Sequence, residues 1–388
     1  MTSHSNFFGE RNPQAVLKHG ILTRYAHYFA GRAGSATRCR VAFIDAYAGA
    51  GRYEDGSPGS PILLASEATR AKVFGRQVKL CFIEPDLQYY NKLQESLKEA
   101  KVRPDMLLDT PFDQAIDTLL ERYVGYALLI FIDPFGLALN RTKLLQILER
   151  SSINQPIDVI YHFSLSSVAR IGRAGILDSK SAIQNARRLD ETLGIVDWRE
   201  KFANANKSGE STKAAMSIST QFSTSVSNES GAISTSIVVR QRPGHLPKYK
   251  LILFSKNQKA HWDFADQTSM AYVDWLHHCD KKDYERNLQL KATSGLQTLF
   301  QEDIPDRSNV EELLESEALE YLKDHVSSII KEQRCIRLID HIEDVYSAML
   351  GKARTRHLRQ VINLLHTEGL IDDNGQGDFC DREICWIG

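Results

Sequence analysis

Short apolar runs and segments of helical periodicity alternate over the first 255 residues. The apolar runs, bounded by turn residues, lie at 41–44, 78–83, 106–110, 127–132 and 157–163. Such runs are typical of strands buried on both faces. Between them, apolar residues recur every three or four positions, which predicts helices at 14–30, 62–73, 87–99, 112–123 and 140–148.

Two further strands are predicted at 234–242 and 249–255, and a turn containing Pro and Gly joins them as an antiparallel pair. Strands that alternate with helices and end in such a pair predict an α/β fold. We therefore expect a doubly wound, Rossmann-like sheet with an antiparallel hairpin at its edge.

The intervening region, about 164–230, is polar but keeps a helical face. Its apolar residues Ala215, Ile218, Phe222 and Val226 are three or four positions apart, so we expect a helical insertion. From about residue 305 the pattern is helical only, at 310–332, 336–349 and 355–368, and short apolar pairs follow at 370–371 and 384–387. This order predicts a winged helix-turn-helix, and hence two domains, 1–295 and 296–388.

Charge and cysteine usage narrow the classes of function. The 48 basic and 49 acidic residues balance, so contact with nucleic acid must come from a local patch. The six cysteines form no CxxC pair, and we expect reduced thiols, no metal site and a cytoplasmic protein. Residues 1–10 are polar, which predicts no signal peptide, and no apolar run is long enough to span a membrane.

The first predicted strand ends in an acidic residue and a turn rich in glycine, Asp45-Ala-Tyr47-Ala48-Gly49-Ala-Gly51. Glycine lets the backbone turn tightly and approach a ligand, and ligands of open α/β sheets bind beyond the carboxyl ends of the strands. Glu54 stands where the G-x-G-x-x-G fingerprint needs a third glycine. This argues against NAD and leaves room for another cofactor that contains adenosine. A plain strand-to-loop turn is the alternative.

Acidic residues also follow the second and third predicted strands. Glu84, followed by Pro85, stands where a carboxylate would accept hydrogen bonds from a ribose, and the alternative is an exposed carboxylate. Asp109 or Thr110 is a candidate for the adenine amino group. The loop 52–61 is long enough to touch ligand or substrate and contains Arg52, Tyr53 and Ser60, and Ser60 is predicted to cap the next helix before Pro61.

The fourth strand is the most apolar and ends in Asp133-Pro134-Phe135-Gly136. The carboxylate and an outward carbonyl could together accept both hydrogens of an exocyclic amine, and Phe135 offers a face for a planar base. Such positioning can contribute about 7 to 11 kcal/mol of barrier lowering. The alternative is an ordinary turn, because Asp-Pro commonly initiates turns.

Together these motifs resemble class I S-adenosylmethionine-dependent methyltransferases. More closely, Phe43-Ile-Asp-Ala-Tyr-Ala-Gly-Ala-Gly-Arg-Tyr, Gly59-Ser-Pro and Phe131-Ile-Asp-Pro-Phe-Gly resemble the three-Cys-motif partner proteins, over about residues 15–265, and the C-terminal helices resemble the winged-helix domain on some members. Asp-Pro-Phe-Gly is also similar to the motif of transfer-RNA guanine-N2 methyltransferases, and it departs from the Asp-Pro-Pro-Tyr of DNA amino-methyltransferases.

The resemblance implies S-adenosylmethionine as cofactor and assigns roles to the motifs. It implies that the glycine turn holds the methionine end, Glu84 the ribose, Asp109 the adenine, and residues 133–136 the methyl acceptor. The cofactor candidates are Asp45, Tyr47, Ala48, Gly49, Gly51, Glu84, Pro85, Asp109 and Thr110.

A cluster of cations opens the last predicted helix, which favours contact with phosphates, although a solvated helix face would look similar. It consists of Lys352, Arg354, Arg356, His357 and Arg359. Three functions stay open: a methyltransferase acting on a base amine of RNA or DNA, a cofactor-binding partner of another enzyme, and a small-molecule methyltransferase.

Overall fold

The computed structural model describes residues 13–134, 136, 139–174, 180–195, 197–294 and 304–388. The chain forms two compact units, one of Leu22–Asn257 and one of Pro13–Ile21 together with Gln258–Gly388. The division at 257/258 differs from the boundary predicted at 295/296. The reason is the helix α10 (Gln258–Ser294), which belongs with the second unit.

The first unit is built on a seven-stranded sheet. Its strands are β1 (Arg40–Asp45), β2 (Gln77–Ile83), β3 (Met106–Leu108), β4 (Ala127–Ile132), β5 (Ile157–Phe163), β6 (Ile233–Arg240) and β7 (Pro247–Ser255). They are ordered β3-β2-β1-β4-β5-β7-β6. The first five are parallel, β7 is antiparallel to β5, and β6 is antiparallel to β7. This confirms the predicted α/β sheet with an antiparallel edge pair.

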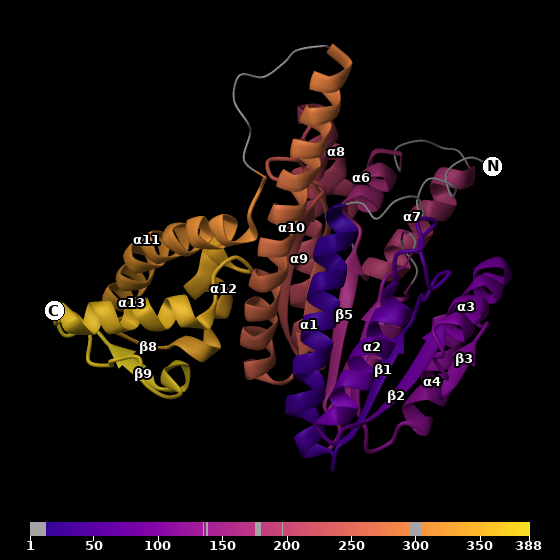
Figure 1. Cartoon of the computed structure of the whole chain (residues 1–388), viewed down its shortest axis with the longest axis horizontal. Helices are drawn as coiled ribbons and strands as arrows, with labels where there is room; N and C mark the ends of the chain where they lie inside the picture. Colours follow the sequence, from indigo (N-terminus) through magenta and orange to yellow (C-terminus); the bar gives the residue numbers. More distant parts are fainter. Residues whose placement is uncertain (1–12, 135, 137–138, 175–179, 196, 295–303) are drawn as a thin grey trace. The chain divides into compact units, whose positions relative to one another are not determined.

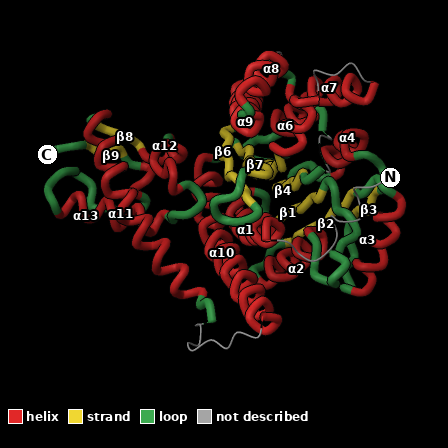
Figure 2. The backbone as a smooth tube through the Cα atoms, turned by 90° about the horizontal axis from the view of Figure 1, so that it is seen from above, coloured by secondary structure: helices red, strands yellow, loops and turns green. Residues whose placement is uncertain are grey.

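Helices cover both faces of this sheet. Figure 2 shows α2 (Ser60–Val73) and α3 (Leu87–Glu99) on one side, and α4 (Phe112–Arg122) on the other. The apolar side chains of α4, α5 (Arg141–Glu149) and α9 (Ser211–Ser230) form one core with alternate residues of the central strands. Since the strands are buried on both faces, their sequences are apolar without interruption.

The insertion predicted at about 164–230 consists of α6 (Leu165–Ala174), α7 (Lys180–Leu193), α8 (Trp198–Ser208) and α9. Three residues predicted to form the apolar face of α9, Ala215, Ile218 and Val226, are fully buried. A Cβ added to Gly172 of α6 would lie 2.3 Å from the ring of Phe202 in α8. The two helices therefore pack too closely for any larger residue.

The second unit contains α10, α11 (Arg307–Gln333), β8 (Cys335–Arg337), α12 (Ile342–Tyr346), α13 (Thr355–Thr367) and β9 (Glu383–Cys385), labelled in Figure 1. The helix predicted at 336–349 is wrong. That segment forms β8, the short α12 and two 3-10 turns, because Arg334 and Ser347 adopt positive φ and β8 pairs with β9. The winged helix-turn-helix assignment stays a prediction.

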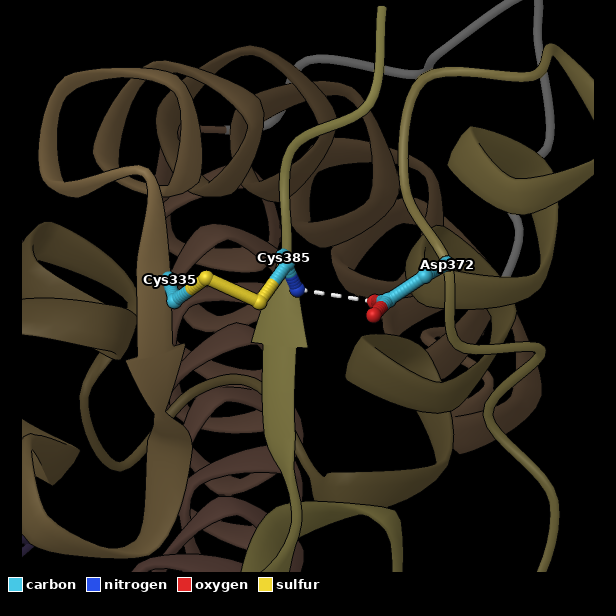
Figure 3. The surroundings of a disulfide bond; sticks show 3 residues. All are labelled: Cys335, Asp372 and Cys385. Atoms are coloured by element: carbon cyan, nitrogen blue, oxygen red, sulfur yellow. Dashed lines mark hydrogen bonds between the residues drawn. A yellow bond between two sulfur atoms is a disulfide. The ribbon is translucent and has the colours of Figure 1, made fainter.

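A disulfide joins β8 to β9. Cys335 and Cys385 are directly opposite in the antiparallel pair, with an S–S distance of 2.07 Å. Figure 3 shows that the Cys385 amide also donates to Asp372, at 2.8 Å. This corrects the expectation of reduced thiols, because strand pairing brings together two cysteines 50 positions apart. Among the described residues, no helix combines the length and apolar character that crossing a bilayer requires.

In the first unit, the carboxylate of Asp158 in β5 joins three elements. It is 1% exposed, and it accepts hydrogen bonds from Tyr25 Oη at 2.6 Å and Arg32 Nη2 at 2.8 Å, both from helix α1 (Pro13–Ala36). Ser255 Oγ of β7 donates to its other oxygen, at 2.5 Å. A buried charge is tolerated because it is paired and hydrogen-bonded in this way.

We predict that Asp158→Ala destabilises the protein by about 3–5 kcal/mol, because Arg32 would lose its partner in the interior. Tyr25→Phe should cost about 1.5–3 kcal/mol, the usual contribution of a hydrogen bond to a charged group. Urea unfolding measures both. Asp117→Ala is the control, since its side chain is 63% exposed and its ion pair with Lys143 is weak. Equal losses for Asp158→Ala and the control would contradict the prediction.

We also predict that Cys335→Ser lowers the free energy of unfolding of the second unit by about 2–4 kcal/mol, because the disulfide constrains its unfolded chain. A reductant should have the same effect on the wild type and none on the variant. Thiol titration of the unfolded protein checks the pairing, and six free thiols without reductant would show that it is absent.

Candidate functional site

The strand order reverses between β1 and β4. The chain leaves β1 toward β2 on one side, while β4 lies on the other side of β1. In open α/β sheets, such a switch point opens a crevice beyond the carboxyl ends of the strands. Asp45 ends β1, Glu84 follows β2 and Asp133 follows β4. The sheet thus brings three predicted residues to one edge.

The glycine turn after β1 is held by both neighbouring strands. The Ala46 amide donates to the carbonyl of Phe131 in β4, and the Ala48 amide to the carbonyl of Ile83 in β2, each at 2.9 Å. The Gly49 amide then donates to Glu84 Oε2 at 2.8 Å. Gly49 adopts φ of 60°, a conformation that favours glycine.

At Gly51 the turn packs closely against α3. It has φ of 78°, and an added Cβ would lie 2.9 Å from the Cβ of Ser96. The amide of Gly59 donates to the Gly51 carbonyl at 2.9 Å, and a Cβ on Gly59 would meet the same oxygen. Gly59 is the N-cap of α2. Ser60, which the sequence analysis predicted as the cap, is instead the first residue of the helix and is buried.

Glu84 is 4% exposed and anchors two turns at once. Its Oε1 accepts from the Asp86 amide at 2.9 Å, while Oε2 accepts from Gly49. Burial raises the pKa of Glu84, and the two amide donors partly oppose that rise. A carboxylate can accept about four hydrogen bonds, so Glu84 keeps acceptor capacity for a ligand. The neighbouring Pro85 is exposed.

Two further predicted residues follow β3, beside Glu84. The Glu84 amide donates to the Leu108 carbonyl at 2.9 Å, and Asp109 and Thr110, the next residues, are exposed.

Asp45, at the end of β1, is fully buried, and its Oδ1 accepts from the Tyr47 amide at 3.4 Å. The ring of Tyr47 meets Phe112 edge-on at 6.4 Å, and burial raises the pKa of its hydroxyl.

Beyond β4, Asp133 faces a histidine that the sequence analysis did not single out. His162 Nδ1, in β5, lies 3.6 Å from Asp133 Oδ1. The His162 ring contacts Tyr249 of β7 at 4.2 Å between centroids. The sequence carried one signal for His162: it is a polar residue near the carboxyl end of an otherwise apolar strand. Pro134 is buried and Gly136 has φ of 97°, whereas Phe135 lies outside the described residues.

Arg52 and Tyr53 belong to the loop between the turn and α2. Arg52 Nη1 donates to the carbonyl of Gly56 at 2.9 Å, and the Tyr53 amide donates to that of Ser57 at 2.9 Å. Both line a hollow of about 490 Å³ against α3, which Tyr89 also lines. Ala50 of the glycine turn lines it as well, whereas Glu84 and Asp133 are not among its lining residues.

In the second unit, the predicted phosphate-binding arginines already have partners. Arg354 Nη2 lies 2.5 Å from Glu311, and Arg356 Nη2 lies 2.7 Å from Glu315. Arg359 Nη2 donates to the carbonyl of Gly377 at 3.0 Å. These contacts hold α13 to its own unit.

The other two members of that cluster are His357 and Lys352. His357 is 2% exposed, and burial together with Arg356 and Arg354 lowers its pKa to about 4, so its ring stays neutral. Lys352 is half-buried. The first amide of α13, from Thr355, donates to Asp266 at 2.7 Å. Contact of this cluster with nucleic acid stays a prediction.

No protein-family model matches the chain, and no curated protein sequence does. Several solved structures of methyltransferases match its fold. TYW2 from M. jannaschii, in complex with AdoMet, is 10% identical, with 58% of this chain and 75% of that chain covered and a TM-score of 0.28. A putative O-methyltransferase from Klebsiella pneumoniae is 15% identical, with 65% and 93% covered and a TM-score of 0.32.

The plantazolicin methyltransferase BpumL, in complex with SAH, is 13% identical, with 61% of this chain and 86% of that chain covered and a TM-score of 0.30. At such identities and TM-scores, these likenesses carry no argument about what the chain binds or transforms.

Proposed function

We propose that this protein is an S-adenosylmethionine-dependent methyltransferase that methylates an exocyclic amino nitrogen of a nucleic-acid base. The supporting observation is the set of residues that the strand order brings together at the switch point. There a glycine turn anchored on Glu84 lies beside the chain that leads to Asp133. The cofactor half of the site, the glycine turn with Glu84, suits an adenosine cofactor. The acceptor half, Asp133 with His162, suits an amine.

The cofactor half rests on the donors and acceptors of the turn. Glu84 holds the Gly49 amide and keeps acceptor capacity, which ribose hydroxyls would use. Asp109 and Thr110 follow the adjacent strand and are exposed, so they are available to an adenine amino group. The glycines let the backbone approach the methionine end closely. When bound, S-adenosylmethionine would supply an electrophilic methyl group.

The acceptor half rests on Asp133 and His162. A carboxylate beside a backbone carbonyl can accept both hydrogens of an amine and so aim its lone pair, and this orientation requires no metal. Asp133 would first take the proton that the amine gives up, and neutral His162, whose Nδ1 lies 3.6 Å from Asp133 Oδ1, is placed to accept it from that carboxyl group. The ring of Tyr249 packs against His162 and fixes its orientation.

We expect Glu84→Gln to weaken binding of S-adenosylmethionine about 10- to 100-fold, because one amide donor would face an amide nitrogen and an acceptor for the ribose would be lost. Isothermal titration measures the affinity. The control is Glu99→Gln, an exposed carboxylate at the end of α3, the helix that follows Glu84. Equal affinities for wild type, variant and control would refute the cofactor assignment.

We expect the wild type to transfer labelled methyl groups to total RNA or DNA. Asp133→Asn should lose at least about 100-fold in transfer and retain cofactor binding, the size of loss seen when one preorganised hydrogen-bonding group is removed from an active site. Asp117→Asn serves as the control on an exposed surface. Cofactor binding with no transfer by the wild type to either polymer would instead favour a partner protein. Transfer only to small molecules would favour a small-molecule enzyme.

A further inference from the structure

A hollow with cationic side chains lies between the end of α3 and the strand β3. The strand order places β3 at the edge of the sheet, and Figure 2 shows α3 next to it. The hollow has a volume of about 650 Å³, within the usual range of binding pockets. Its lining combines three cations with four apolar residues and one amide, and it includes no Asp or Glu. We call it the cationic hollow.

The three cations of this hollow have no partner in their own chain. They are Lys98, in the last turn of α3, and Lys101 and Arg103, in the segment before β3, and all three are exposed. Within the part of the chain that the structure describes, none of their side chains forms an ion pair or a hydrogen bond. The carboxylate of Asp105, two positions after Arg103, is already paired with Lys79 Nζ at 2.8 Å. The charge of the hollow is therefore available to a partner.

The floor of the hollow is apolar and aliphatic. Leu97 is 3% exposed, and Val102 and Leu107 are half-buried. None of the lining residues is aromatic. Single-stranded nucleic acids bind by stacking their bases on aromatic rings, so this lining does not suit them. Cations beside an aliphatic floor instead suit a protein segment that carries an apolar side chain among carboxylates.

The hollow lies at the other end of the sheet from the candidate site. The helix α3 begins just after Glu84, at the carboxyl end of β2, and its 13 residues span about 20 Å. Because β2 and β3 are parallel, α3 runs back to the amino ends of the strands before the chain enters β3. A molecule bound in the hollow would leave the carboxyl ends of the strands open. This position favours a partner over a substrate.

The helix α11 of the second unit carries a surface of opposite charge. We define its acidic face by five exposed residues, Glu312, Leu313, Glu317, Glu320 and Asp324. The last four are four, three and four positions apart, so they lie along one side of the helix. Among the described residues, none of the four carboxylates has an ion pair or hydrogen-bond partner. Leu313, which is 72% exposed, is the large apolar side chain among them.

The acidic face and the cationic hollow are complementary in two independent respects. The carboxylates match the cations in charge, and the exposed Leu313 matches the aliphatic floor. Helices that dock in grooves present residues at spacings of i, i+4 and i+7, which are the positions of Leu313, Glu317 and Glu320. An apolar centre with a charged rim is typical of protein interfaces, and the charges fix the register of the two surfaces.

We propose that two copies of this chain associate, with the acidic face of α11 in one copy docked on the cationic hollow of the other. Each copy carries both surfaces, so a two-fold axis would form the contact twice and close a dimer. The inference does not rest on the proposed function, because neither surface contains a residue assigned to the cofactor or the acceptor.

The test is charge reversal, with association of the full-length protein measured by sedimentation equilibrium. The hollow variant is Lys98→Glu/Arg103→Glu, and the helix variant is Glu317→Lys/Glu320→Lys. Each variant alone sets like charges against each other in both contacts. We therefore expect each to associate at least about 100-fold more weakly than the wild type.

The matched control is Lys72→Glu/Lys256→Glu, which reverses two exposed cations outside both surfaces. It should associate like the wild type, and equal weakening in the control and the hollow variant would overturn the inference. Raising the salt from about 0.1 to 1 M shortens the screening length from about 10 to 3 Å and should weaken association of the wild type.

Mixing the two variants separates a lost contact from a lost fold. The reversed hollow of one variant then meets the reversed helix of the other, and the two unchanged surfaces meet as well. We expect the mixed pair to associate within about 10-fold of the wild type, which misfolded variants could not do. A wild type that is monomeric at about 100 μM, or a mixture that stays monomeric, would overturn the inference. The cations would then serve only to protect an edge strand from pairing.

Discussion

The hydrogen bond from the Gly49 amide to the Glu84 carboxylate is the contact on which the candidate site depends. It joins the turn after β1 to the tip of β2, and the adjoining amides of Ala46 and Ala48 tie the same turn to β4 and β2. A buried carboxylate is costly unless donors surround it, and a tight turn leaves amides that need acceptors. The amide of Gly49 supplies a donor to the Glu84 carboxylate, and the carboxylate supplies an acceptor to that amide. The turn is therefore held in one conformation before any ligand binds.

That geometry depends in turn on the order of the strands. Only because β4 lies beside β1 do Asp45 and Asp133 end at one edge, and only because β5 follows β4 does His162 face Asp133. The buried Asp158, with Tyr25, Arg32 and Ser255, fixes α1 and β7 to β5 in the interior. The acceptor half is therefore supported by a polar network that has nothing to do with the chemistry.

The arginines at the start of α13 show how ion pairing decides what a cation can do. In α13, the arginines neutralise Glu311 and Glu315, so their charge stabilises the second unit. A cluster of basic residues in a sequence therefore does not identify a nucleic-acid surface until the positions of the Asp and Glu side chains are known, because ion pairs with them neutralise the positive charge.

The sequence by itself determined the strands and helices of the first unit, because burial on both faces leaves long apolar runs and helices leave a periodicity of three to four. It also located Gly49, Gly51, Glu84 and Asp133, since turn glycines and acids at strand ends are local signals. The tertiary structure alone decided what depends on distant neighbours: the cap at Gly59, the pairing of Asp133 with His162, the disulfide between Cys335 and Cys385, and the partners of the α13 arginines. The segment 336–349 shows the same limit, because its apolar spacing suits a helix equally well, and only the pairing of β8 with β9 selects the strand.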